Sequence, residues 1–140
     1  MALLENHLVI KRSGIKGAGK GLFTRKFIEK GTRIVEYKGT KTTWKDVKQQ
    51  PEFNGYVYYI NRDLVIDAKE HLKTFGRFAN DAKGISTEKS LKNNSSYVID
   101  KEKVFIEAIT DIPAGSEILV SYGKEYWDVV RHNKKLGFII

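Results

Sequence analysis

The sequence predicts a β-rich α+β fold, and two observations support this prediction. Short apolar runs rich in β-branched and aromatic residues recur along the chain, and residues that favour turns separate them. Stretches with helical spacing are few and short by comparison. With 140 residues, of which 41% are hydrophobic, the chain is long enough for one domain with its own core. It has no repeat and no linker, so residues 1–140 are expected to form a single domain.

The elements of this fold are expected in close succession. One short helix is predicted from Thr42 or Thr43, either of which can cap it, to about Gln50, where Pro51 stops it. A tight turn near Lys101 is expected to join the strands on either side of it. The predicted strands are Leu8–Ile10, Leu22–Phe27, Thr32–Tyr37, Gly55–Ile60, Leu64–Asp67, Ser95–Ile99, Lys103–Ile109 and Glu117–Val120.

Two of the expected hairpins share a pattern. In one the chain turns at Gly31 and its second strand ends at Tyr37, and in the other it turns at Gly115 and ends at Tyr122. A glycine follows each tyrosine closely. Two hairpins that each bring a tyrosine to a strand end would suit a shared aromatic pocket, although coincidence in a β-rich chain explains the pattern as well.

Composition excludes several kinds of site and suggests a kind of partner. With no cysteine, the chain has no disulfide, thiolate nucleophile or cysteine zinc cluster, and its three histidines lie far apart, so no metal site is expected. A net charge of +8 indicates affinity for acidic partners, nucleic acid included. No apolar run approaches the roughly 20 residues of a membrane span. The N-terminus does not resemble a signal peptide, so we expect a soluble intracellular protein.

A glycine-rich segment, Lys11–Gly21, lies near the start of the chain. Its closely spaced glycines rule out a helix or a regular strand, and they leave a bare backbone that can approach a ligand. The segment is not a phosphate-binding loop, because no Gly-Lys-Ser/Thr follows, and it is not a dinucleotide fingerprint, because no long apolar helix follows. By itself the segment is more typical of a flexible loop than of a binding loop.

Three motifs, taken in order, resemble those of the SET-domain protein-lysine methyltransferases. The family's early Gly-x-Gly segment corresponds to Gly17–Phe23 (GAGKGLF). Its middle motif, of the type Arg-Phe-x-Asn-His-Ser, corresponds to Arg77–Ala82 (RFANDA), with Asp81 in place of the histidine. Its C-terminal Gly-Glu-Glu-Leu-x-x-x-Tyr corresponds to Gly115–Tyr122 (GSEILVSY). The resemblance covers most of the chain.

The resemblance implies a fold of small curved β-sheets. In it, the C-terminal segment would thread in a knot-like way beneath a loop formed by the middle motif, which would bring residues near 80 and 122 together. The motif-bearing core would run from about 11 to 127, with a helical tail over about 124–140. Cofactor and target lysine would enter from opposite faces and meet in a narrow channel. Because cysteine-rich flanking modules are absent, Tyr126 and Trp127 are the candidates to close it.

The resemblance also implies roles for individual residues. Tyr122 would be catalytic and aim its hydroxyl at the reacting amine, while Tyr37 and Tyr97 would line the channel for the substrate lysine. The residues that would bind the cofactor are Ala18, Gly19, Lys20, Asn80, Asp81 and Trp127. Each role has a structural alternative, because aromatic residues also pack in cores, lysines are usually solvated and asparagines complete turns. The substitution at Asp81 leaves the role of that side chain open.

The implied reaction moves a methyl group from S-adenosylmethionine to a lysine of a protein substrate, such as a histone or another basic protein, and leaves S-adenosylhomocysteine. It needs in-line alignment and a neutral amine, which an apolar aromatic channel favours over the ammonium ion. It needs no metal and no strong base, and the sequence has no obvious catalytic histidine. The alternative is a basic binding module with a vestigial cofactor pocket that engages nucleic acid or an acidic protein.

Overall fold

The chain forms three small antiparallel sheets, shown by a computed structural model that describes residues 3–51, 54–83, 91–123 and 126. This confirms the predicted β-rich α+β class. Helical elements are short, namely α1 (Trp44–Lys48) and the 3-10 helices Glu5–His7 and Gly76–Phe78. The first sheet pairs β1 (Leu8–Arg12) with β2 (Lys20–Thr24). The second has the strand order β3 (Arg33–Glu36), β8 (Lys103–Ala108) and β7 (Ser95–Asp100). The third has the strand order β4 (Thr40–Thr42), β6 (Leu64–Asp67) and β5 (Val57–Asn61).

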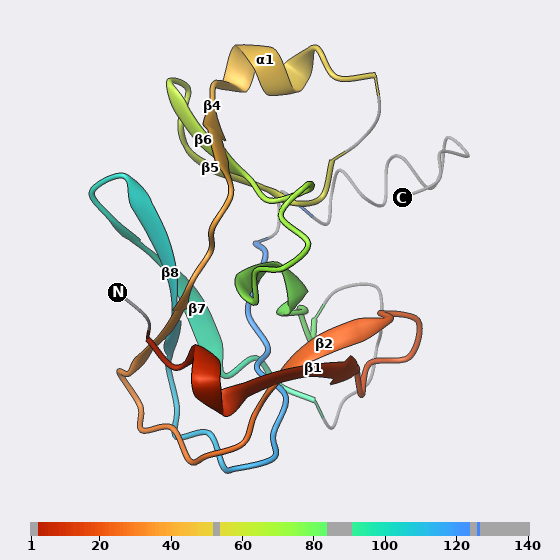
Figure 1. Cartoon of the computed structure of the whole chain (residues 1–140), viewed down its shortest axis with the longest axis vertical. Helices are drawn as coiled ribbons and strands as arrows, with labels where there is room; N and C mark the ends of the chain where they lie inside the picture. The colour runs from red at the N-terminus through yellow and green to blue at the C-terminus, as the bar shows by residue number, and fades with distance from the viewer. Residues whose placement is uncertain (1–2, 52–53, 84–90, 124–125, 127–140) are drawn as a thin grey trace.

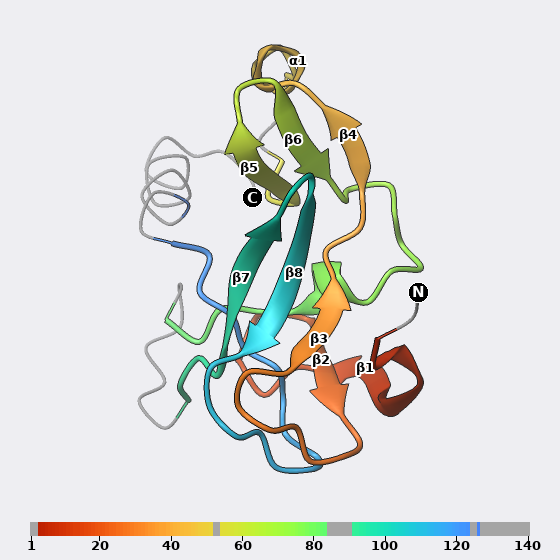
Figure 2. The same cartoon turned by 90° about the vertical axis from the view of Figure 1, so that its left-hand side faces the viewer.

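The sheet β3-β8-β7 lies in the middle of the molecule (Figure 2). The sheet β4-β6-β5 and α1 lie at one end, and the β1–β2 hairpin lies at the other (Figures 1 and 2). The predicted helix and the predicted turn near Lys101 are both confirmed. The Thr43 hydroxyl caps α1 by accepting the N–H of Asp46 over 3.2 Å. Lys101 lies in the turn between β7 and β8 and has a φ of 58°. Every described helix is too short or too polar to cross a bilayer.

Neither of the two tyrosine-bearing hairpins forms as predicted. Strand β2 pairs with β1, and β3 pairs with β8, so the strands on either side of Gly31 do not pair with each other. Residues 117–120 form no regular strand and do not pair with β8; isolated bridges join them to Phe23, Asn80 and Ser95 instead. Each tyrosine therefore reaches its place through long-range pairing.

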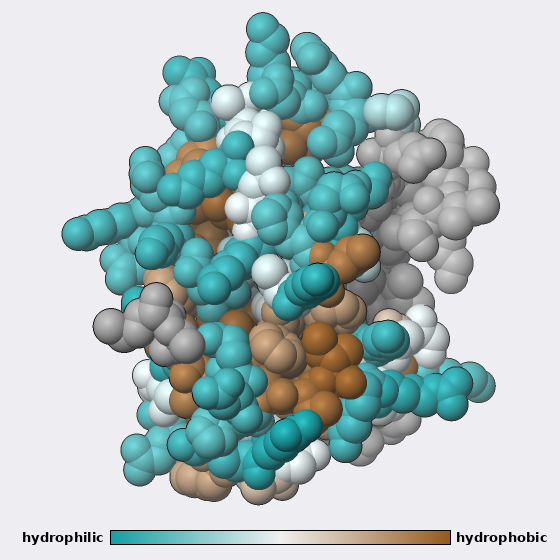
Figure 3. Space-filling model, in the orientation of Figure 1, coloured by the Kyte–Doolittle hydropathy of each residue, from teal (hydrophilic) through white to brown (hydrophobic). Residues whose placement is uncertain are grey.

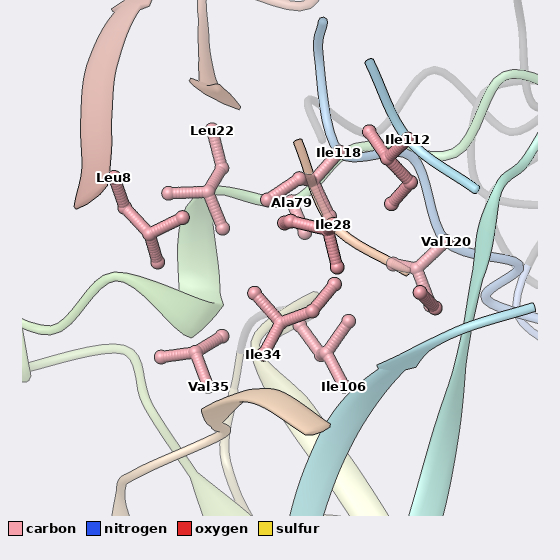
Figure 4. Packing of buried hydrophobic residues seen from close by; sticks show 11 residues of the cluster. Leu8, Leu22, Ile28, Ile34, Val35, Ala79, Ile106, Ile112, Ile118 and Val120 are labelled. Atoms are coloured by element: carbon pink, nitrogen blue, oxygen red, sulfur yellow. The ribbon is translucent and has the colours of Figure 1, made fainter. Parts of the chain in front are cut away.

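The two turn regions pair with one another, which explains why the local hairpins are absent. Ile28 and Ile112 each donate their N–H to the other's carbonyl over 2.8 Å, and both side chains are fully buried. Ile118 and Val120 of the C-terminal segment enter the same core (Figure 4). Burying these side chains stabilises the fold by about 1.5–3 kcal/mol for each. The other members of this core include Leu8, Leu22, Ile34, Val35, Ala79, Ile106 and Ala108.

Candidate functional site

The segment that ends at Tyr122 lies against the middle motif, 41 positions away in the sequence. The N–H of Val120 donates to the carbonyl of Asn80 over 2.8 Å. Two residues further on, the N–H of Tyr122 donates to Asp81 Oδ2 over 2.9 Å, and its hydroxyl donates to the carbonyl of Ala79 over 2.5 Å. Residues 79–81 thus hold Tyr122 by both its backbone and its phenol. Knot-like threading stays a prediction, because residues 84–90 lie outside the described ones.

Five tyrosines from distant parts of the chain meet at this site, and we call them the tyrosine row. The ring of Tyr122 contacts that of Tyr126 edge-on, with 4.8 Å between centroids. Tyr97, on β7, packs against both large apolar clusters and joins them. Its ring centroid lies 4.8 Å from that of Tyr58 and 5.8 Å from that of Tyr37. The expected channel residues Tyr37 and Tyr97 are therefore brought together near Tyr122.

The phenols of the tyrosine row are neutral hydrogen-bonding groups. Burial raises the pKa of Tyr97 and of Tyr122 well above the usual value, and neighbouring phenols raise both further. Burial also raises the pKa of Tyr37, against a smaller opposite effect from Arg77, and the Tyr37 hydroxyl donates to the carbonyl of Tyr56 over 2.7 Å. A phenol that holds its proton so firmly can orient a partner, but it is a poor source of phenolate base.

This burial predicts a loss of stability at alkaline pH. The folded chain keeps protons on Tyr37, Tyr97 and Tyr122 at a pH where unfolded tyrosine, with a pKa of about 10, has lost them. Stability should therefore be complete below about pH 10 and fall as the pH rises through the raised values. Urea unfolding from pH 8 to 11, with phenolate absorbance followed in parallel, measures this. Ionisation of these phenols ahead of unfolding would contradict the burial.

A buried carboxylate that sequence reasoning missed, Glu117, ties the glycine loop to the middle motif. Its Oε2 accepts the hydroxyl of Ser13 over 2.6 Å and the side-chain amide of Asn80 over 3.3 Å, and its Oε1 accepts the N–H of Gly14 over 2.9 Å. A Cβ at Gly21 would overlap with Oε2, so glycine is required for the carboxylate to sit there. The family-like motif contains this glutamate, but only the fold shows what it contacts.

The residues expected to bind the cofactor converge from two segments. The side-chain amide of Asn80 donates to the carbonyl of Lys20 over 2.9 Å, which brings the middle motif against the glycine loop. The N–H of Ala18 donates to the carbonyl of Ile15 over 3.1 Å, and Gly19 has a φ of 74° with open space where a Cβ would be. The loop therefore offers bare backbone beside Asn80. Trp127 lies outside the described residues.

The carboxylate of Asp81 faces backbone and amide donors. It is only 6% exposed, and besides Tyr122 its Oδ1 accepts the N–H of Lys83 over 2.8 Å and the side-chain amide of Asn93 over 2.9 Å. Asn93 in turn accepts the N–H of Ala82 over 2.8 Å. An acceptor-only side chain suits this position, because these partners are all N–H donors.

The chain is similar to known methyltransferases. A family model described as SET domain matches residues 19–123. N-lysine methyltransferase KMT5A-A of Danio rerio is 29% identical over 119 residues, which are 78% of this chain and 33% of that protein. KMT5A-A of Xenopus laevis is 28% identical over 124 residues, which are 81% of this chain and 36% of that protein. The chain thus spans about a third of the length of these curated relatives.

A solved structure has a similar fold. The methyltransferase domain of human PR domain-containing protein 2 matches with a TM-score of 0.60 and 25% sequence identity. The match covers 84% of this chain and 77% of that one. The similarity of fold therefore extends over most of this chain.

Proposed function

The chain belongs to the SET domain family, and on this premise we propose that it is a protein-lysine methyltransferase with S-adenosylmethionine as methyl donor. The similarity to N-lysine methyltransferases at about 28% identity supports the activity. The observation that supports it most is the position of Tyr122. Residues 79–81 hold it within the tyrosine row, and Asn80 of the same segment donates to the carbonyl of Lys20 in the glycine loop. The expected substrate is a lysine in a histone or another basic protein.

The residues at the site suit the proposed cofactor. S-adenosylmethionine supplies a methyl group on a positively charged sulfur, and electron-rich surroundings favour that charge. The site offers such surroundings in the carbonyl of Ala79, the phenol of Tyr122 and the carboxylate of Asp81. The bare backbone of Ala18–Lys20, together with Asn80, would hold the rest of the cofactor, and Trp127 is proposed to cover it. Among the described residues no His, Asp and Glu group is arranged to bind a metal.

The tyrosine row suits the proposed acceptor, a lysine side chain. A free lysine has a pKa of about 10.4 and is protonated at neutral pH, whereas methyl transfer needs the neutral amine. Buried aromatic surroundings around Tyr37, Tyr97 and Tyr58 disfavour the ammonium ion by desolvation. The neutral phenol of Tyr122 would then orient the amine, and the proton would leave to water. The proposed role of Tyr122 is therefore to align the amine with the methyl group, and this role needs no strong base.

Two measurements test the proposal together. Calorimetry with S-adenosylmethionine should show saturable binding, and incubation with the labelled donor and a mixture of basic proteins should give lysine methylation that mass spectrometry locates. Binding without methylation would point to an untested substrate. Absence of both would favour the binding module, for which the net charge of +8 is the supporting observation.

The role of Asp81 in positioning Tyr122 gives a further prediction. An Asp81→Asn amide has one acceptor oxygen and cannot accept at both carboxylate positions, so one N–H donor of Tyr122, Lys83 or Asn93 would face another donor. Displacement of Tyr122 should slow methyl transfer roughly 10- to 100-fold. Asp63→Asn, at an exposed turn, is the control with the same charge change. Equal rates for the two variants would remove Asp81 from this role.

A further inference from the structure

The positive charge of the chain is concentrated in one segment. Residues 8–28 contain six Lys and Arg and no Asp or Glu, whereas the rest of the chain contains 19 Lys and Arg against 17 Asp and Glu. This short segment therefore carries +6 of the net +8. All six side chains are exposed, and they are Lys11, Arg12, Lys16, Lys20, Arg25 and Lys26.

The segment is the β1–β2 hairpin with the loops at its two ends, and it forms one end of the molecule (Figures 1 and 2). Arg12 pairs with Lys20 across the hairpin at one end, while Arg25 and Lys26 follow β2 at the other. The salt bridges among the described residues involve Arg33 and Lys41, and none of the hairpin cations. The hairpin thus presents cations at both of its ends.

Apolar and aromatic surface lies among these cations. The Nζ atom of Lys11 sits 4.5 Å from the centroid of the Phe23 ring, and Phe27 is 51% exposed. Figure 3 shows hydrophobic surface over β1 and β2, bordered by hydrophilic residues. Cations interleaved with aromatic rings can contact both phosphates and base faces.

We propose that the β1–β2 hairpin binds the phosphodiester backbone of nucleic acid. A polyphosphate chain carries one sign of charge at a regular spacing, which matches a segment that has six cations and no acid. An acidic protein surface usually presents both signs and would be met by a mixed pattern, which the hairpin lacks.

Such binding would also remove an obstacle to the proposed function. A chain of charge +8 and a basic protein substrate repel each other, and a nucleic acid that binds both would place them together. This use of the hairpin rests on the proposed function. The binding itself does not, and it can be measured without a methyl donor.

Fluorescence anisotropy of the full chain with a labelled duplex DNA and with a single strand of equal length tests the proposal. We expect binding that weakens steeply between 50 and 200 mM salt. The triple variant Lys11→Gln, Arg25→Gln, Lys26→Gln should bind roughly tenfold more weakly, with a salt slope smaller by about 0.9 for each phosphate that the variant no longer neutralises. None of these three residues belongs to the proposed methyl-transfer site.

A matched variant at the other end of the molecule separates the hairpin from net charge. Lys45→Gln, Lys48→Gln, Lys69→Gln removes the same charge from exposed positions on α1 and just after β6, and it should change affinity less than twofold. Equal losses in the two triple variants would overturn the assignment to the hairpin. Polyglutamate that binds as tightly as DNA would overturn the assignment to nucleic acid. Unchanged S-adenosylmethionine binding in both variants keeps this result separate from the proposed function.

Discussion

Replacing Tyr122 by phenylalanine is expected to reduce methyl transfer by about 100-fold or more while the fold survives. Residues 79–81 hold Tyr122 in place: its phenol donates to the carbonyl of Ala79, and its backbone N–H donates to the carboxylate of Asp81. Phenylalanine keeps the ring contact with Tyr126 but loses the hydroxyl that would align the amine. The loss of one buried hydrogen bond should cost only about 1 kcal/mol of folding free energy.

Single-turnover methylation and chemical unfolding, measured on the same preparation, separate these two effects. Tyr59→Phe is the matched control, because Tyr59 lies on β5 with 51% of its surface exposed and contacts Trp44 rather than the tyrosine row. S-adenosylmethionine should still bind to the Tyr122 variant. A Tyr122→Phe chain that methylates at the wild-type rate would remove Tyr122 from the mechanism.

Replacing Glu117 by alanine should have the largest effect on stability, about 3 kcal/mol or more. The change leaves three donors, the hydroxyl of Ser13, the N–H of Gly14 and the amide of Asn80, without their shared acceptor. Each buried donor left unpaired costs about 1–3 kcal/mol. Since Asn80 also holds the carbonyl of Lys20, cofactor affinity should fall together with stability.

Urea unfolding and calorimetry with S-adenosylmethionine measure both consequences. Glu107→Ala is the control, because Glu107 is partly exposed in an ion pair with Arg33, where about 0–1 kcal/mol is expected. Gly21→Ala should reproduce part of the Glu117 effect, since its Cβ would displace the same carboxylate. Full stability and full cofactor affinity in the Glu117 variant would show that the glycine loop is held by other interactions.

Much of this site could be predicted from the sequence, because the family's motifs encode long-range proximity that local patterns do not. The ordered motifs predict that residues near 80 and 122 meet, and they do. The resemblance also predicts that Tyr37 and Tyr97 line one channel, and their rings lie 5.8 Å apart although the two residues are distant in the sequence. Local signals also located α1 and the turn at Lys101, since a cap and a turn each depend on a few adjacent residues.

The other features of the fold and the site depend on contacts between distant segments, which patterns of adjacent residues do not specify. The prediction of a hairpin that turns at Gly31 is wrong. The turn region before Gly31 pairs instead with the turn region before Gly115, through Ile28 and Ile112. The carbonyl of Ala79 could not be identified, because a backbone acceptor has no sequence signature. Glu117 belongs to the C-terminal motif, but the sequence does not show that its carboxylate accepts from Ser13 and Gly14, about a hundred positions away.

A crystal structure of the chain with S-adenosylhomocysteine is the most direct test of where the methyl group would be transferred. We predict that the sulfur faces the hydroxyl of Tyr122 and the carbonyl of Ala79, with the rest of the molecule along Ala18–Lys20 and beside Asn80. The tyrosine row should then lead from the sulfur to the surface. A ligand bound elsewhere, or a sulfur separated from Tyr122 by packed side chains, would contradict the account.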